Sequence, residues 1–388
     1  MIIRTFVAAS VVVLSASPVI AQQTPADVVS FLVTNQSVQT GDFQKDQAAA
    51  AATRDTITRA LLVNLASVPI PTSSSGFVYR LDPELGTMNR VSDSFGTFFV
   101  ERASTSGRGR VSFGGAASAA DYNRLDGLKL TDGTLVTTAN MFRDETAPFD
   151  TESLTLKMHT KTLTLYGSVG VTDRLEVGGV LPLVQLHLEG TRVNVYRGET
   201  FVQASGTADV SGLADVAIRG KYTLVSAVTG GFAVAGELRL PTGDEADLLG
   251  AGRTGFRLLA IGSAEQSRVG VHGNAAFAWG GVSDEADMRG ALTVAVSPRV
   301  TATGELLWRR FSDLREMVAA TAPHPTIIGV DTLRLVPGTS ATIVSTLVSG
   351  VKWNVASTMV LTGQLQFRLG GGGLTAPVTP TIALDYLF

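Results

Sequence analysis

The chain has 388 residues, a formal net charge of −3, 17% charged side chains and 41 glycines, and its mean hydropathy is +0.24. The slightly acidic balance gives no support for a nucleic-acid partner, and a sequence without cysteine excludes disulfides and Cys-ligated metal sites. No apolar run of about 18 residues follows the N-terminus, so no spanning helix is predicted. Such a chain is typical of a membrane β-barrel, whose lipid-facing residues alternate with polar ones.

Residues 1–21 are predicted to form a secretory signal peptide. Arg4 supplies a short positive region, an apolar stretch follows it, and small residues precede a cut after Ala21. A membrane anchor is the alternative, but the apolar core is short and is interrupted by two serines and a proline. We therefore expect an exported protein.

Residues 22–106 differ in composition from the rest of the chain. Apolar side chains from Ile57 to Leu65 recur every four residues in an Ala-rich context, which predicts one amphipathic helix over residues 43–66. The stretches FVYRLD and TMNRVSD are predicted to form a short hairpin around Glu84–Gly86.

From residue 107 onward the apolar period is two. In the stretch DVAIRGKYTL, Ile218 and Tyr222 share one face, while Arg219 and Lys221 share the other. Charges in the middle of a long strand need water, which the lumen of a membrane barrel provides. Twelve such segments are predicted, each long enough to cross a bilayer: 107–121, 153–171, 173–189, 208–225, 231–242, 254–264, 268–281, 286–297, 299–312, 341–353, 356–369 and 376–388.

The connections between these segments alternate in length. Short ones such as VTDR and SPR alternate with longer ones, of which 122–152 and 313–340 are the longest and only 282–285 is marginal. Short periplasmic turns and longer outside loops are typical of outer-membrane barrels. We therefore predict an all-β fold: a twelve-stranded antiparallel transmembrane β-barrel over residues 107–388, in the bacterial cell outer membrane, preceded by an N-terminal amphipathic helix and hairpin segment.

The last strand has to pair with the first to remove the open edge of the sheet. Its outward residues Tyr386 and Phe388 are predicted to lie in the periplasmic aromatic girdle. The terminal Phe388 also resembles the C-terminal signal read by the outer-membrane assembly machinery, which is therefore an expected partner.

Polar residues in the inward phase are the candidates for lining a pore. Basic residues outnumber acidic ones, so mild anion preference is one hypothesis. The alternative is that arginines and glutamates pair across adjacent strands and fill the barrel. The candidates are Arg219, Lys221, Glu237, Arg239, Arg257, His272, Arg289, Glu305, Arg309 and Arg368.

Two short motifs favour bland interpretations. GAGRTG (250–255) matches a dinucleotide-binding pattern, but a strand-like stretch follows it, so an outer loop is expected. The sequence DEAD occurs twice, and both copies are predicted to lie in outside loops. Their carboxylates are expected to be solvated, with weak cation binding as the alternative, at Asp244, Asp247, Asp284 and Asp287.

Enzymatic chemistry is not predicted. No histidine pair has the spacing of a metal motif, so neither a metal site nor a cofactor is expected. A hydrolase would need a serine, a histidine and an orienting group. Ser263, His272 and Asn274 could approach one another, but a site in the lumen would point away from lipid substrates.

Three stretches carry a family resemblance: VTDRLEVGGVLPLVQ (171–185), GLADVAIRGKYTL (212–224) and GELRLPTGDEADLLGAG (236–252). Together they resemble the outer-membrane family of the phenol-degradation meta pathway, a distant relative of the long-chain fatty-acid transporters. Leu240–Asp244 is the most specific part. The resemblance, over about 107–388, implies a barrel that passes aromatic or other hydrophobic small molecules. The Asn-Pro-Ala element of the fatty-acid transporter hatch does not occur in this sequence, so a hatch role for the N-terminal helix is an analogy.

We therefore predict a monomeric channel for passive uptake of small hydrophobic or aromatic molecules through outer-membrane lipid. Twelve strands lie between filled eight-stranded barrels and open porins of 16–18 strands. Residues 22–106 are accordingly predicted to plug or narrow the interior, with a position in the periplasm as the alternative. The alternative function is a structural or adhesive barrel that acts through its extracellular loops.

Overall fold

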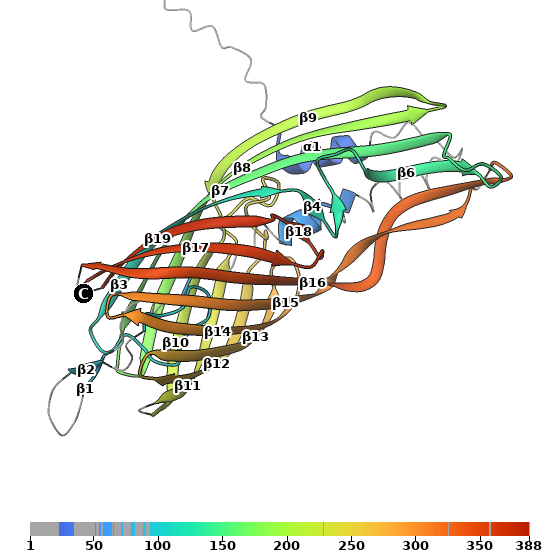
Figure 1. Ribbon diagram of the computed structural model, residues 1–388. Coiled ribbons are helices and arrows are strands. Elements are labelled where there is room, and N and C mark those ends of the chain that lie inside the picture. Colours follow the sequence, from blue (N-terminus) through green and yellow to red (C-terminus); the bar gives the residue numbers. More distant parts are fainter. Residues whose placement is uncertain are drawn as a thin grey trace, which may run out of the picture.

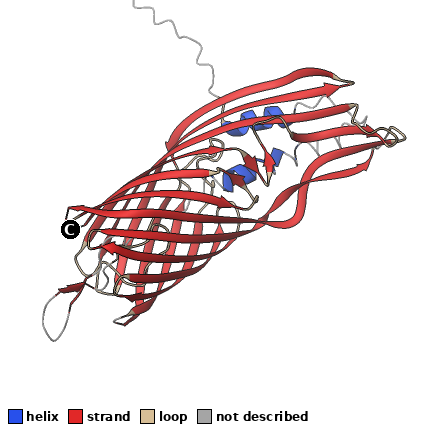
Figure 2. Ribbon diagram, in the orientation of Figure 1, coloured by secondary structure: helices blue, strands red, loops and turns tan. Residues whose placement is uncertain are grey.

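The computed structural model describes residues 23–34, 51, 54–55, 57–63, 65, 71–72, 79–81, 88–90, 94–227, 229–324, 326–356 and 358–387. A closed β-barrel forms the main body, and one side of it continues into a long sheet beyond the rim (Figure 1 and Figure 2). No helix in this part of the chain is long and apolar enough to cross a membrane. The predicted signal peptide lies outside the described residues.

Twelve antiparallel strands make up the barrel, and each is hydrogen-bonded to the next along the chain. The last strand closes on the first through pairs from Thr381↔Ser118 to Leu387↔Ser112. The predicted twelve-stranded antiparallel barrel is therefore confirmed. Its strands are β3 (Val111–Tyr122), β7 (Asp150–Gly170), β8 (Leu175–Tyr196), β10 (Val216–Ala227), β11 (Gly230–Leu240), β12 (Gly255–Gln266), β13 (Val269–Gly280), β14 (Glu285–Ser297), β15 (Val300–Pro323), β16 (Val330–Ala356), β17 (Met359–Leu369) and β19 (Val378–Leu387).

The wall has an apolar outer face and a polar inner face. On β10, Ile218 and Tyr222 are 46% and 43% exposed on the outside, whereas Arg219 and Lys221 are 8% and 1% exposed on the inside. Exposed aliphatic side chains in this position fit lipid, and closure of the sheet pairs the backbone polar groups that lipid cannot hydrate. The period of two therefore has the physical cause that the sequence predicted.

Short turns lie at one end of the barrel, among them 171–174, 267–268 and 298–299. At the opposite end, the connections predicted to be loops are largely strands. They contain β6 (Leu135–Phe142), β9 (Glu199–Leu213) and the outer parts of β15 and β16. The prediction of outside loops is wrong there, because these stretches bury one face against the N-terminal helices described below.

The strands that continue beyond the rim form a wall in the order β9–β8–β7–β6–β16–β15 (Figure 1). β8 changes partner along its length: Val180 pairs with β10, and Leu183 pairs with β9. β6 joins β7 to β16 through Asn140, which pairs with Asp150 on one side and Thr332 on the other. This outer wall is the part of the fold that the sequence did not reveal.

Helix α1 (Pro25–Thr34) was not predicted, although its start carries a clear signal. The Thr24 hydroxyl accepts a hydrogen bond from the Asp27 amide at 3.1 Å, and the Asp27 carboxylate accepts one from the Thr24 amide at 3.3 Å. This reciprocal pair is a capping box, and Pro25 occupies the favoured first helical position.

α1 lies on the inner face of β8 and β9. Val28 and Leu32 are fully buried there, over two glycines that allow the close approach. A Cβ at Gly190 would overlap Leu32, and one at Gly206 would lie 3.1 Å from Val28 Cγ1. The described residues between 51 and 65 are also helical, in agreement with the predicted helix, and join the same apolar cluster.

The predicted hairpin is present as β1 (Tyr79–Leu81) paired with β2 (Met88–Arg90). A second small sheet lies at the outer mouth, formed by β4 (Arg124–Leu125), β5 (Leu128–Lys129) and β18 (Leu374–Thr375). Asp126 ties this sheet to the wall by accepting the amides of Met317 at 3.0 Å and Gly373 at 2.6 Å. Burial raises the pKa of the Asp126 carboxyl, and these two hydrogen bonds oppose the rise.

Candidate pore and inner plug

Residues 94–106, here named the inner plug, run through the barrel interior near the end with the short turns. Their amides donate to side chains of β15. The Phe95 amide binds the Thr301 hydroxyl at 3.0 Å, and three consecutive amides from Phe98 onward bind the Glu305 carboxylate, two of them at 2.9 and 3.1 Å. One wall carboxylate thus fixes the backbone of the plug at this point.

The second half of the plug is bound in the same way. Asn274 accepts the Glu101 amide at 2.7 Å and donates to the Glu101 carbonyl at 3.0 Å. Ser263 accepts the Ala103 amide at 2.9 Å, and Thr223 donates to the Ala103 carbonyl at 2.6 Å. Buried backbone groups must be paired, and here side chains of the wall supply the partners that another strand would supply in a sheet.

The Glu101 side chain forms ion pairs with the wall. One of its oxygens pairs with Arg219, and the other lies 3.2 Å from Lys221 Nζ. Lys221 also lies 3.4 Å from Glu176, whose second oxygen accepts the amide of Ser106 at 2.7 Å. Glu101, Lys221 and Glu176 are each 1% exposed. Removing one member of such a set leaves a buried charge without compensation.

Closer to the outer rim, arginines and carboxylates pair across the inner face of β12 to β15. Arg257 binds Glu285 at 2.9 Å and Asp287 at 2.7 Å. Arg309 binds Glu285 at 2.8 Å, and Arg289 binds Asp287 at 2.5 Å. These contacts are the cross-strand pairing that the sequence offered as an alternative to anion preference.

The structure places all the pore candidates on the inner face of the wall, buried or half-buried. Arg239 contacts Glu237 at 3.0 Å, and Arg368 donates to the Leu374 carbonyl at 3.0 Å. Their roles in conduction remain predictions. The full set is Arg219, Lys221, Glu237, Arg239, Arg257, His272, Arg289, Glu305, Arg309 and Arg368.

A cavity of about 120 Å³ lies inside the barrel between β3, β7 and β15–β17. Arg309, Arg368 and Tyr122 line it together with threonine and serine hydroxyls. Leu307 also lines it and belongs to the apolar cluster that contains Phe98 of the plug. This polar chamber therefore adjoins the plug.

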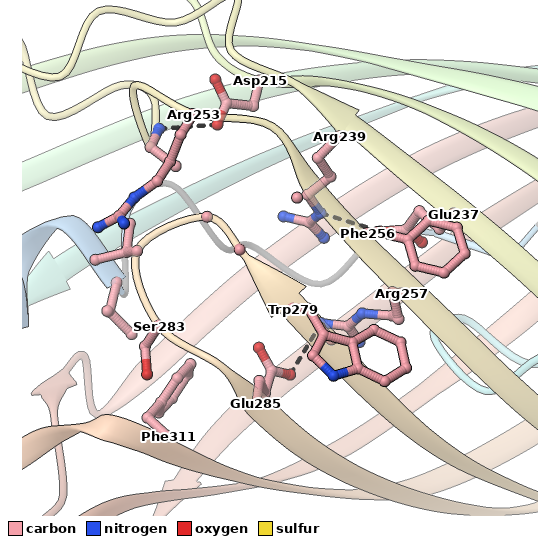
Figure 3. A pocket seen from close by; sticks show the side chains of 17 residues that line it. Asp215, Glu237, Arg239, Arg253, Phe256, Arg257, Trp279, Ser283, Glu285 and Phe311 are labelled. Atoms are coloured by element: carbon pink, nitrogen blue, oxygen red, sulfur yellow. Dashed lines mark hydrogen bonds and ion pairs between the residues drawn. The ribbon is translucent and has the colours of Figure 1, made fainter.

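A smaller pocket of about 50 Å³ opens at the rim where β12 begins and β13 turns into β14. Figure 3 shows Arg257 directed toward Glu285 and Arg239 directed toward Glu237. Phe256 and Trp279 stack with ring centroids 6.0 Å apart. At roughly 10–15 Å³ per water, this free volume holds only a few waters.

Sequence reasoning missed a buried polar cluster behind the plug. Arg102 is fully buried and lies 3.5 Å from Glu265, which lies 3.8 Å from His272 Nε2. His272 Nδ1 is 3.0 Å from the Ser263 hydroxyl, the group that accepts the Ala103 amide. The serine and histidine named as a hydrolase alternative do meet, but their contacts here hold the plug.

One prediction for the DEAD motifs is wrong. Asp287 is not in a solvated loop but in β14, where it is 2% exposed and bound to Arg257 and Arg289. The alternation of β14 begins at Glu285, so Asp287 points inward. Asp244 lies in the connection between β11 and β12 and accepts the Ala246 amide at 2.8 Å. Asp247 lies in the same connection, and Asp284 precedes β14. Cation binding at these residues stays a prediction.

At the end of β19, the ring of Tyr386 lies 5.5 Å from that of Phe113 on β3. This contact joins the closing pair of strands at the end with the short turns. Phe388 lies outside the described residues, so its role as an assembly signal stays a prediction.

A closed antiparallel barrel with an apolar outer band and a polar interior is the architecture of outer-membrane proteins. The protein is therefore located in the bacterial outer membrane, with lipid around the exposed aliphatic residues of the wall.

No family model and no curated protein match the chain. Among solved structures, an outer membrane channel from Pseudomonas putida F1 aligns at 13% identity and a TM-score of 0.47, covering 74% of this chain and 98% of that one. The NanC porin aligns at 7% identity and a TM-score of 0.38, with 70% and 98% covered. The KdgM porin, solved with disordered oligogalacturonate, aligns at 9% and 0.35, with 70% and 99% covered. These likenesses are of the general barrel fold, and the family resemblance of the sequence stays a resemblance.

Proposed function

We propose that the protein is an outer-membrane channel for the passive entry of small hydrophobic or aromatic molecules, and that the inner plug controls passage. The observation that carries the proposal is the plug itself. It occupies the interior through hydrogen bonds and ion pairs with wall side chains, and these interactions can break and re-form without any energy source.

The polar chamber beside the plug supports the cargo class. Its volume of about 120 Å³ is close to the roughly 150 Å³ of an engineered cavity that holds benzene. The guanidinium groups and hydroxyls of its wall suit a single ring that carries a hydroxyl or carboxylate. The family resemblance of residues 171–252 independently favours aromatic compounds.

A reversible lock on the plug tests the proposal. The Ser94 and Thr293 hydroxyl oxygens are 3.1 Å apart, and the chain has no native cysteine. The double variant Ser94→Cys/Thr293→Cys is therefore expected to form a disulfide between the plug and β14. In proteoliposomes, the oxidised variant should be impermeable to small aromatic solutes, and reduction should restore the wild-type swelling rate.

The two single-cysteine variants serve as matched controls, since neither can form the link and both should resemble the wild type. Equal swelling of the oxidised and reduced double variant would contradict plug control. If the wild type and a variant lacking residues 94–106 both failed to pass any solute, the channel function itself would be wrong.

One observation favours the alternative of a structural or adhesive barrel. The outer wall of β6 to β9, β15 and β16 projects beyond the rim and presents ordered strands in place of flexible loops. Deleting β9 and the outer part of β8 would separate the two functions, because solute passage should survive while an adhesive role should not.

A further inference from the structure

Two histidines and two aspartates form a row across the outer face of four adjacent strands. Asp121 on β3 pairs in register with His159 on β7, His159 with His187 on β8, and His187 with Asp209 on β9. The imidazole rings stack with centroids 6.0 Å apart and planes inclined by 30°. This row is separate from the lumen and has no part in the proposed function.

The hydrogen bonds of the row select the metal-binding nitrogen of each ring. His159 Nδ1 binds the Asp121 carboxylate, and His187 Nδ1 lies 2.6 Å from the Asp209 carboxylate. In a neutral imidazole one nitrogen donates and the other keeps a lone pair. Because the carboxylates take the proton at Nδ1, both Nε2 atoms are left as acceptors. A carboxylate behind a histidine is the usual support of a metal-ligating imidazole.

The position of the row gives access from water. The side chains of His159 and His187 are 52% and 39% exposed, and a groove lined by all four residues of the row opens over them. On the same face of β7, the lipid-facing Leu163 follows four residues after His159 and is 43% exposed. The row therefore lies just outside the apolar band.

The charges around the row favour a cation over an anion. With neutral imidazoles, Asp121 and Asp209 leave the row negative. Of the two lysines beside it on β7, Lys157 pairs with Glu189 at 3.2 Å. Lys161 is next to the apolar band, where its long stem can extend along lipid. A phosphate would meet both carboxylates, whereas a divalent metal ion would be attracted by them.

We propose that His159 and His187 form a surface site for a divalent transition-metal ion such as Zn²⁺ or Cu²⁺, with Asp121 and Asp209 as positioning residues. No three His, Cys, Asp or Glu side chains of the described chain converge on a metal position, so the protein supplies two ligands and water completes the shell. Metal–nitrogen distances near 2.0–2.1 Å require the Nε2 atoms to approach to roughly 3–4 Å. Rotation of two half-exposed rings on directly opposed positions can provide this approach.

Zinc titration of the purified full-length protein in detergent tests the site. Isothermal calorimetry should show saturable binding by the wild type and loss of that heat in the variant His159→Ala/His187→Ala. Asp121→Asn and Asp209→Asn keep the ligands but remove the charged support, and each should weaken the affinity by about 10- to 100-fold. Acidification should also weaken binding, because protons compete for the same nitrogens.

His324→Ala is the matched control, since His324 lies at the far end of β15 and binds the Thr326 and Ile327 amides. It should bind zinc like the wild type. Heat-dependent gel mobility would verify that each variant has a folded barrel. Zinc binding that persists in the double histidine variant, or a wild type without saturable heat, would overturn the proposal.

Discussion

Two parts of the N-terminal region fill the barrel by different physical means. The inner plug is held by directional bonds from wall side chains such as Glu305 and Asn274. The outer helices are held by burial of apolar side chains, among them Val28, Leu32 and Leu61, all 0% exposed. Directional bonds concentrate the stabilisation in a few groups, whereas apolar burial spreads it over area. The plug can therefore be released by disturbing one charge, and the outer helices cannot.

The largest effect is expected from Lys221→Met. This change leaves the Glu101 and Glu176 carboxylates buried near each other without their shared cation. The free energy that holds the plug should fall by about 3–5 kcal/mol. The cysteine of Ser94→Cys, whose parent side chain is fully buried, reports release of the plug through its rate of reaction with a maleimide.

Lys157→Met is the matched control for this comparison. Its ion pair with Glu189 is about half exposed on the outer surface and should contribute no more than about 1 kcal/mol. If Lys157→Met accelerated labelling as much as Lys221→Met, the plug would not depend on its buried charges.

A somewhat smaller effect is expected from Leu32→Ala at the apolar end. Removing a fully buried leucine should cost about 2–5 kcal/mol, because Gly190 and Gly206 have no side chains that could fill the space. Denaturant unfolding in lipid vesicles measures this loss. Labelling at position 94 should stay unchanged, since the plug is held by other groups.

Phe31→Ala tests whether the location of the side chain matters. Phe31 lies on the same helix but is 44% exposed, so its removal should cost much less. Equal losses for the two variants would mean that α1 does not pack on β8 and β9 as described.

The barrel could be predicted because lipid and lumen impose a period of two on every spanning strand. Ile218, Arg219, Lys221 and Tyr222 show the pattern within five residues. The outer wall could not, because residues 190–207 and 313–340 lie beyond the apolar band and have no lipid to face. Their apolar sides contact helices from a distant part of the chain, and a single sequence does not reveal such partners. Only the start of α1 carried a local signal, in Thr24, Pro25 and Asp27.

The lining of the candidate site could be predicted from strand phase, but its binding partners could not. Glu305 was identified as inward-facing, whereas its three bonds to plug amides depend on where a segment 200 residues earlier lies. The pairing of His159 with His187 was within reach. The turn from Val171 to Leu175 fixes the hairpin register, and positions of equal sum face each other across it.

The next effect in size is expected from Asn274→Ala. The variant loses an acceptor for the Glu101 amide and a donor for its carbonyl, and an unsatisfied buried group costs about 1–3 kcal/mol. Labelling at position 94 should accelerate, by less than in Lys221→Met. Asn194→Ala is the control, because Asn194 is also buried but lies in the outer wall beside Glu152. It should leave the labelling rate unchanged.

The smallest effect is expected from salt. Raising the ionic strength from 0.1 to 1 M shortens the Debye length from about 10 to 3 Å, which weakens exposed ion pairs. Glu101, Lys221 and Glu176 are each 1% exposed, so mobile ions do not reach between them. Labelling at position 94 should therefore change by less than about 1 kcal/mol in equivalent free energy. A double-mutant cycle on Lys157 and Glu189 should lose its coupling under the same conditions. Rapid labelling in 1 M salt would mean that water enters the plug's ion pairs, and the contrast between a dry polar plug and an apolar outer core would fail.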